Sequence, residues 1–356
     1  GTRAVWASDP DQEGQLRQSG DGWTGTLPAG VPVANSAVNW AGVRWIMLVG
    51  PLPTDAADRR VLVGHEAWHR AQDQIGLAMG PSDNTHLASE RGRYFMRLEM
   101  RALASALRSS GNARERAARD ALAFRRARYG EFPGAFAQEA ALDRNEGLAA
   151  YTGVRLGADQ PDIYAARTLD RHDGHEALAR AYAYATGPAY GLLLDTYDED
   201  WRRTLNAFAP ADMLASVLRA PPYDTRELRR TAERYGGPTV AAEEQTRAQA
   251  AAAERAALQQ RYASGPRLEL PLAEMQMEFD PNQVVPIEGL GSFYGRITLR
   301  DRWGELVAAE GALIDPTFTR IIAAAPGPDG HSGPGWRLSL NPAWSTTTAA
   351  DGVIRA

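Results

Sequence analysis

A long central region, from about residue 55 to residue 262, is the feature that most constrains how this chain folds. Ala, Leu, Arg and Glu dominate this region, and they favour helices because their side chains lose little freedom there. The first 60 residues are instead rich in Gly, Pro and Trp, and about the last ninety alternate polar and apolar residues. We therefore predict an α+β fold with an N-terminal β layer, a largely helical core and a C-terminal antiparallel β module.

These changes in composition divide the chain into three predicted parts, residues 1–60, 61–263 and 264–356. Short runs of β-branched and aromatic residues bounded by Gly and Pro predict strands in the two outer parts. The predicted strands are Val31–Val33, Ala37–Trp40, Val43–Val49, Leu268–Leu270, Met275–Phe279 and Arg296–Leu299.

In the central part, apolar residues at helical spacing predict helices, and glycines predict where the helices end. Val61, Trp68 and Ile75 share one face of a helix predicted for about residues 55–78. Three further helices are predicted for Asn84–Arg108, Ala113–Tyr129 and Thr239–Tyr262, and helix stops are predicted at Gly111, Gly130, Gly153, Gly236 and Gly237.

The absence of Cys removes thiol catalysis, cysteine zinc sites and disulfides as explanations for this chain. Any metal must then be held by imidazole nitrogens and carboxylates. The six histidines occupy positions 65, 69, 86, 172, 175 and 331.

Net charge and hydropathy exclude two broad classes of partner. The net charge is −5 and all 39 basic residues are Arg, so the chain has no general attraction to nucleic acid or to an anionic membrane. No apolar run approaches the roughly 18 residues of a membrane span. The chain begins with Gly1 rather than Met, which favours a periplasmic or secreted protein that has lost a signal segment.

The segment Val63-Gly64-His65-Glu66-Ala67-Trp68-His69 carries the strongest chemical signal. Residues four apart stack on one helix face, so His65 and His69 can offer two imidazoles to one ion. Glu66 lies about 100° around the helix, where it can reach a water on that ion. This H-E-x-x-H spacing predicts a Zn²⁺ site with Glu66 as general base.

The third zinc ligand must come from elsewhere in the chain. A metzincin would place Gly and His where Gln72 and Ile75 stand, so that branch is excluded. The residues Asn145, Glu146, Gly147, Ala149 and Tyr151 resemble the N-E-G-F-A-x-Y segment of gluzincin metallopeptidases, including the alanyl and glycyl aminopeptidase families. This resemblance implies Glu146 as the third ligand. His172 and His175 remain the rival ligands.

The spacing between the two motifs differs from that of the resembled families. His69 and Glu146 are 77 residues apart, whereas those aminopeptidases keep the Glu much closer to the second His. The two helices predicted between them form an inserted helical hairpin at about residues 84–129. Long insertions between fixed elements add little closure entropy, so the site geometry can survive this insertion.

A second resemblance lies in the segment Tyr184-Ala185-Thr186-Gly187, which precedes an apolar helix with Leu192-Leu193-Leu194-Asp195. It is similar to the Y-x-K-G and L-L-L-D segments of the glycyl aminopeptidase family, with Thr186 in place of Lys. The resemblance implies that Tyr184 stabilises the oxyanion, with Tyr190 in reserve. Such a hydrogen bond lowers a reaction barrier by a few kcal/mol.

A weaker resemblance concerns the N-terminal part. The segment Asn35–Trp40 resembles the strand that lines the substrate cleft in these aminopeptidases. Their strand carries a Glu that binds the substrate amine, and Asn39 is the nearest polar residue here.

Together these motifs predict zinc-dependent hydrolysis of peptide bonds in a peptide or protein substrate. The predicted ligands are His65, His69 and Glu146, and the catalytic residues are Glu66 and Tyr184. Two alternatives remain: a non-catalytic binding or scaffold protein on a metallopeptidase fold, and a zinc hydrolase of a non-peptide amide or ester.

Overall fold

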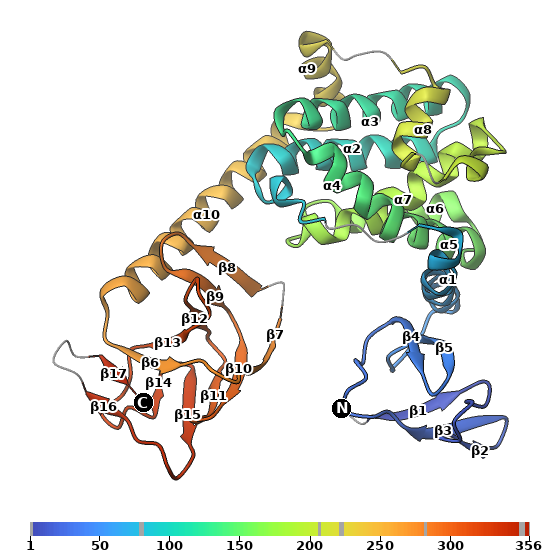
Figure 1. Cartoon of the computed structure of the whole chain (residues 1–356). Helices are drawn as coiled ribbons and strands as arrows, with labels where there is room; N and C mark the ends of the chain where they lie inside the picture. The colour runs from blue at the N-terminus through green and yellow to red at the C-terminus, as the bar shows by residue number, and fades with distance from the viewer. Residues whose placement is uncertain are drawn as a thin grey trace. The chain divides into compact units, whose positions relative to one another are not determined.

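The computed structural model describes most of the chain, in the ranges 3–77, 82–205, 208–220, 224–280, 283–348 and 353–355. The chain forms two compact units, Gly1–Gln245 and Thr246–Ala356. The predicted α+β architecture is confirmed: a small β region comes first, helices follow, and a β module ends the chain (Figure 1). The contact boundary between the units falls within the last helix, α10 (Gly237–Ser264), rather than at its end.

The N-terminal β region contains two small sheets. The first has the order β1-β3-β2, and the second is a hairpin of β4 and β5. Their bounds are β1 Ala4–Ala7, β2 Arg17–Ser19, β3 Gly22–Thr26, β4 Ser36–Trp40 and β5 Val43–Met47. A two-residue turn with positive φ at Ala41 and Gly42 closes the hairpin, which suits the twist of its strands.

The predicted strand at Val31–Val33 is wrong, whereas those at Ala37–Trp40 and Val43–Val49 correspond to β4 and β5. Pro32 lies in the middle of the first run and has no N–H to donate to a sheet. Strands β1 to β3 were not predicted, because their residues do not form a clear β-branched run.

The helix α1 (Ala56–Gln72) carries the H-E-x-x-H segment. The helix is shorter than the predicted 55–78, because a 3₁₀ turn follows at Asp73–Ile75 and Gly76 adopts a φ of 75°. Residue 78 lies outside the described residues. In the described part of the chain, α1 packs on β4 and β5 (Figure 1).

The predicted helical hairpin corresponds to α2 (Glu90–Arg108) and α3 (Gly111–Glu131). The first helix starts later than expected, since a 3₁₀ turn occupies Thr85–Ala88 and Ser89 caps α2 by accepting from Gly92 N. Helix α2 contacts α3, α6 and α7, and its apolar face is fully buried. The hairpin is thus part of the helical core.

The remaining helices complete the first unit. Their bounds are α4 Ala135–Leu142, α5 Leu148–Gly157, α6 Pro161–His172, α7 Leu178–Tyr197, α8 Pro210–Val217 and α9 Thr225–Arg234, with a π-helical turn η3 at Asp143–Gly147 and a 3₁₀ turn at Trp201–Thr204. One hydrophobic cluster extends through α2, α3, α5, α6 and α7.

The predicted helix stop at Gly153 is wrong, because Gly153 lies inside α5. The stop predicted at Gly130 falls one residue before the end of α3 at Glu131. Gly111, by contrast, begins α3 with a φ of 53°, and Gly236, with a φ of 74°, separates α9 from α10. Glycine either ends a helix or lets another backbone approach closely, and composition does not distinguish these two uses.

The second unit is a β module with two larger sheets. Their strand orders are β14-β15-β11-β10-β7 and β16-β17-β6-β13-β12-β9-β8. The strands are β6 Arg267–Pro271, β7 Gln276–Phe279, β8 Val284–Ile287, β9 Gly291–Tyr294, β10 Ile297–Asp301, β11 Gly304–Ala308, β12 Ala312–Ile314, β13 Arg320–Ala324, β14 Ser332–Gly333, β15 Trp336–Leu340, β16 Thr347–Thr348 and β17 Ile354–Arg355. Among the described strands of this module, β17 pairs with β6 in parallel and the other pairs are antiparallel.

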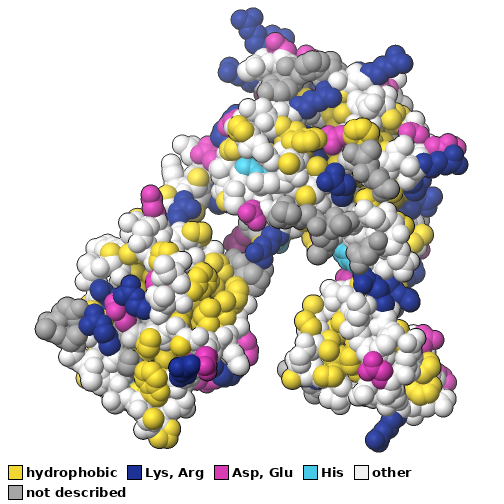
Figure 2. Space-filling view, in the orientation of Figure 1, with side chains coloured by type: hydrophobic (Ala, Val, Ile, Leu, Met, Phe, Trp, Pro, Cys, Tyr) yellow, Lys and Arg dark blue, Asp and Glu magenta, His cyan; other side chains and the backbone are white. Residues whose placement is uncertain are grey.

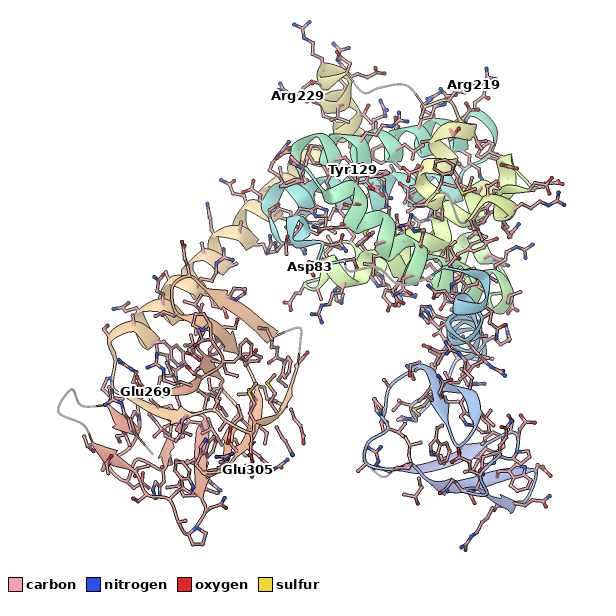
Figure 3. The ribbon with its side chains drawn as sticks, in the orientation of Figure 1. Asp83, Tyr129, Arg219, Arg229, Glu269 and Glu305 are labelled. Atoms are coloured by element: carbon pink, nitrogen blue, oxygen red, sulfur yellow. The ribbon has the colours of Figure 1, made fainter. Side chains whose placement is uncertain are left out.

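The three strands predicted in this module correspond to β6, β7 and β10. Leu258 and Tyr262 of α10 pack with Phe293 and Leu313 of the sheet, so the end of this helix belongs to the β module. Glu269 on β6 is surrounded by three guanidinium groups, and Figure 3 labels its position.

Surface charge is mixed. Figure 2 shows Arg and acidic side chains interspersed on the face in view, in keeping with 39 basic and 44 acidic residues. None of the described helices combines the length and apolarity that crossing a bilayer requires.

Candidate metal centre

Close contact between α1 and α5 depends on glycines. Gly64 of α1 faces Gly153 of α5, and a carbon added to Gly153 would lie 2.4 Å from the carbonyl oxygen of Val61. A carbon added to Gly157, one turn further along α5, would lie 2.4 Å from Val61 N. Because glycine has no side chain, the two backbones approach more closely than other residues allow. The H-E-x-x-H helix therefore lies directly against the helix that follows Glu146.

Glu146 lies on the π-helical turn η3, between α4 and α5. Single π-turns of this kind occur frequently at functional sites. Gly147 on the same turn meets Gly187 of α7, where an added carbon would lie 2.3 Å from the Cα of Gly147. Tyr184 lies one turn before Gly187 on α7. The glycine contacts therefore set η3 against α7 and set α5, which directly follows η3, against α1.

His65, His69 and Glu146, which we call the ligand cluster, bring their donor atoms together. The Nε2 atoms of the two histidines are 3.1 Å apart. Oε2 of Glu146 lies 3.2 Å from Nε2 of His65 and 3.4 Å from Nε2 of His69. All the candidate donor atoms lie within 4.8 Å of one another, and among the described residues this is the one His and acidic group that converges so closely.

The ligand cluster is largely shielded from solvent. The side chains of His69 and Glu146 are 16% and 18% exposed. Burial alone would raise the pKa of Glu146, but its contacts with the two imidazoles and Tyr184 outweigh burial and hold the pKa well below its usual range. Glu146 is therefore a carboxylate, the form that binds cations.

Glu66 follows His65 on α1, and both residues line a cavity beside the ligand cluster. Its side chain is buried, and its Oε2 atom has no hydrogen-bond partner in the part of the chain that the structure describes. Burial raises the pKa of Glu66, with the neighbouring imidazoles opposing the shift. A carboxylate with a raised pKa is suited to accept and return a proton near neutral pH.

Tyr184 contacts the ligand cluster from α7. Its ring stacks on the imidazole of His65, with ring centroids 5.4 Å apart and planes 16° from parallel. Partial burial and the charge of Glu146 raise the pKa of the Tyr184 hydroxyl far above its usual range. The hydroxyl therefore keeps its proton and remains a hydrogen-bond donor at neutral pH.

A cavity of about 610 Å³ adjoins the ligand cluster. Ser36 and Arg44 line it from the β4–β5 hairpin, and Tyr164 and Arg171 line it from α6. The Tyr164 hydroxyl donates a hydrogen bond of 2.7 Å to Asp58 on α1. Pockets of a few hundred Å³ are typical of small-molecule and peptide sites.

The rival ligands His172 and His175 are not part of the ligand cluster. They lie at the end of α6 and in the loop after it, with their rings 5.7 Å apart. Nδ1 of His172 lies 2.9 Å from the carbonyl oxygen of Thr168, and Nδ1 of His175 accepts from the amide of Ala177. These contacts are local and complete the end of a helix.

Two other residues that the resemblance suggested lie away from the cavity. Asn39 is exposed near the end of β4, whereas Asn35, Ser36 and Ala37 line the cavity at its beginning. Tyr190, the reserve for Tyr184, is fully buried in the helical core and donates to Glu99 at 2.8 Å. Tyr184 and Tyr190 are six residues apart on α7, which is about 240° around a helix, so the two side chains point to different faces.

Sequence reasoning did not assign roles to Gln72 and Asn145, which contact the ligands from outside. Gln72 Oε1 lies 3.0 Å from Nδ1 of His69, and Nδ2 of Asn145 donates to Oε1 of Glu146 at 3.0 Å. A signal for Gln72 was present, since positions 65, 69 and 72 share one helix face.

The donor set of the ligand cluster fits zinc. Catalytic zinc takes three protein ligands from imidazole and carboxylate and keeps a further position open to the cavity. Two imidazole nitrogens and one carboxylate oxygen meet here at a cavity wall, beside a buried carboxylate oxygen of Glu66 that has no partner among the described residues.

No protein-family model, no curated protein and no solved structure matches this chain. Its function is therefore inferred from the site and from the resemblance of its motifs.

Proposed function

We propose that this chain is a zinc-dependent metallopeptidase of gluzincin type that hydrolyses peptide bonds in peptide or protein substrates. The observation that carries the proposal is the ligand cluster itself, in which two imidazoles from α1 and a carboxylate from the distant turn η3 meet within 4.8 Å. Residues that only solvate a helix face would not converge in this way beside a cavity.

His65, His69 and Glu146 would hold the zinc. When bound, zinc supplies Lewis acidity that polarises the scissile carbonyl and acidifies a water. The negative charge of Glu146 favours a divalent cation at this point, because the same carboxylate has no guanidinium partner in the described part of the chain.

Glu66 acts as the general base. Its buried Oε2 accepts a proton from the attacking water and then returns it to the nitrogen of the leaving amine. The raised pKa of Glu66 brings its proton affinity closer to that needed for both steps. No covalent link between protein and substrate is required by this arrangement.

Tyr184 stabilises the charge that develops on the carbonyl oxygen. Its hydroxyl keeps its proton, and stacking on His65 holds the ring beside the ligand cluster. A donor fixed in advance at this position stabilises the transition state more than the ground state. Asn35, Ser36 and Ala37 line the cavity at the start of β4, where an extended substrate would lie along the strand.

The test is hydrolysis of a broad peptide library by the full chain. We expect about one zinc per chain, cleavage that a chelator abolishes and zinc restores, and a loss of about 10²–10⁴-fold in kcat for Glu66→Gln with the metal retained. Glu90→Gln, at an exposed glutamate on α2, is the matched control and should cleave like the wild type.

Each other outcome contradicts the proposal in a different way. A protein that binds no transition metal has no zinc site, and the proposal fails entirely. A protein that binds zinc but cleaves no peptide in the library is instead a scaffold on a metallopeptidase fold. If the protein cleaves esters or non-peptide amides but no peptide, it is instead a zinc hydrolase of non-peptide substrates.

A further inference from the structure

We infer that the side-chain amides of Gln72 and Asn145 act together as a positioning bridge that holds two ligands of the zinc site in their binding orientation. The inference rests on the proposed function, because it concerns ligands of the metal proposed there. It adds two residues that the H-E-x-x-H and N-E-G motifs do not assign.

The orientation of the Gln72 amide follows from a backbone contact. Nε2 of Gln72 donates to the carbonyl oxygen of Leu77 at 2.8 Å, and a carbonyl oxygen accepts only. The other end of the amide is therefore the oxygen, which lies 3.0 Å from Nδ1 of His69. Gln72 is 3% exposed, so water does not compete for these hydrogen bonds of its side-chain amide.

This orientation selects the tautomer of His69. Because the Gln72 oxygen accepts, Nδ1 of a neutral His69 carries the proton and Nε2 carries the lone pair. That Nε2 atom is the one that faces the ligand cluster, 3.4 Å from Oε2 of Glu146. The bridge thus presents the imidazole in the form that binds a metal.

The second N–H of Gln72 extends the bridge to the other ligand. Nε2 of Gln72 also donates to Oδ1 of Asn145 at 3.1 Å, which leaves the Asn145 nitrogen as a donor. That nitrogen donates to Oε1 of Glu146 at 3.0 Å. One carboxylate oxygen is therefore held from outside while the other, Oε2, faces the imidazoles.

The bridge connects segments that are far apart in the chain. His69 and Gln72 belong to the end of α1, whereas Asn145 and Glu146 belong to η3. The contact of 3.1 Å between the Gln72 and Asn145 amides joins α1 to η3, and the two flanking contacts pass this spacing on to His69 and Glu146. Outer partners of this kind typically change metal affinity by about 10–100-fold when they are removed.

The experiment measures zinc affinity of the full chain by competition with a chromophoric chelator. The variants are Gln72→Met, Asn145→Leu and the pair together. We expect each single change to weaken zinc binding by about 10–100-fold. The pair should lose little more than the larger single change, because both residues act through one bridge.

Three controls separate positioning from mere packing. Gln138→Met makes the same exchange at a half-buried glutamine on α4 and should leave zinc affinity unchanged. Gln72→Glu keeps the acceptor for His69 and should restore part of the affinity that Gln72→Met loses. The d–d spectrum of bound Co²⁺ should shift in Gln72→Met and Asn145→Leu but not in Gln138→Met.

The outcomes distinguish this inference from the proposed function. If the wild type binds no zinc, both fail. If the wild type binds zinc and both single variants bind it within twofold with an unchanged Co²⁺ spectrum, only the bridge is overturned. If Gln72→Met does not fold, Asn145→Leu decides the result, since Asn145 is only half-buried.

Discussion

Asp143 and Glu146 lie three residues apart on the same π-helical turn, yet they belong to two different clusters of charge. Glu146 faces the imidazoles of the ligand cluster. Asp143 points into the helical core, where its Oδ2 accepts from Arg125 at 2.6 Å. The same turn thus supplies Glu146 to the ligand cluster, which contains no arginine, and Asp143 to a second cluster that contains arginines.

The second group, the arginine–carboxylate cluster, joins α2, α3 and α4 to η3. Its members are Glu99, Arg125, Arg128, Glu139 and Asp143, with N–O contacts between 2.6 and 3.7 Å. Three carboxylates share two guanidiniums here, and the hydroxyl of Tyr190 donates a hydrogen bond to the carboxylate of Glu99. Figure 3 labels Tyr129, whose ring lies under the same two guanidiniums.

The two carboxylates differ in the direction in which their surroundings shift the pKa. Burial, only partly offset by Arg125, raises the pKa of Asp143 to about 6. The pKa of Glu146 is instead lowered by its polar neighbours. Guanidinium groups have only N–H donors and occupy the carboxylate oxygens around them, whereas an imidazole nitrogen that gives up its proton offers a lone pair to a cation.

The largest expected effect is the loss of zinc affinity when Glu146 is replaced. Glu146→Gln removes the charged ligand, so we expect zinc affinity to fall by more than the about 100-fold upper value for outer partners, and hydrolysis to fall with it. Asp143→Asn is the matched change on the same turn. It should keep stoichiometric zinc, measured by metal analysis after gel filtration. Equal zinc loss in both variants would show that the two clusters are not separate.

A smaller effect concerns the arginine–carboxylate cluster. Arg128→Met leaves Glu139 and Glu99 buried without one partner, so we expect the free energy of unfolding to fall by about 3–5 kcal/mol in urea titrations. Arg91→Met removes an exposed pair with Glu131 and should cost about 0–1 kcal/mol. A cost below about 1 kcal/mol for Arg128→Met would mean that this cluster does not stabilise the core.

The smallest predicted effect is a pH dependence. Because the folded pKa of Asp143 is raised to about 6, its neutral form contributes stability that is complete below its unfolded pKa and is lost as the pH rises through 6. The unfolding free energy of wild type should therefore fall by about 1 kcal/mol relative to that of Asp143→Asn between pH 5 and pH 7, because about one pKa unit of the shift lies in this range. A difference that stays constant over this range contradicts the assignment.

Local patterns predicted the elements that carry the chemistry. The H-E-x-x-H spacing placed His65, Glu66 and His69 on one helix, because helical period alone decides which residues share a face. Helices α2 and α3 and strands β4, β6, β7 and β10 were also predicted within a few residues. The orientation of side chains across distant segments was not predicted, since it depends on contacts rather than on period.

The packing role of the glycines and of Gln72 could not be predicted from the sequence. Gly153 was interpreted as the end of a helix, but it lies inside α5 at the point of closest approach to α1. Gln72 appeared only as the residue that excludes a metzincin. Its contacts with His69 and Asn145 depend on the packing of η3 beside α1.

Local sequence patterns were enough to predict the α+β class, the helical position of His65, Glu66 and His69, and the motif that contains Glu146. The tertiary structure decided that Glu146, and not His172 or His175, meets the two imidazoles. The physical reason is that a helix fixes neighbours three or four residues apart, whereas residues 77 positions apart meet only where two backbones can approach. Glycines at Gly64, Gly153 and Gly187 permit that approach.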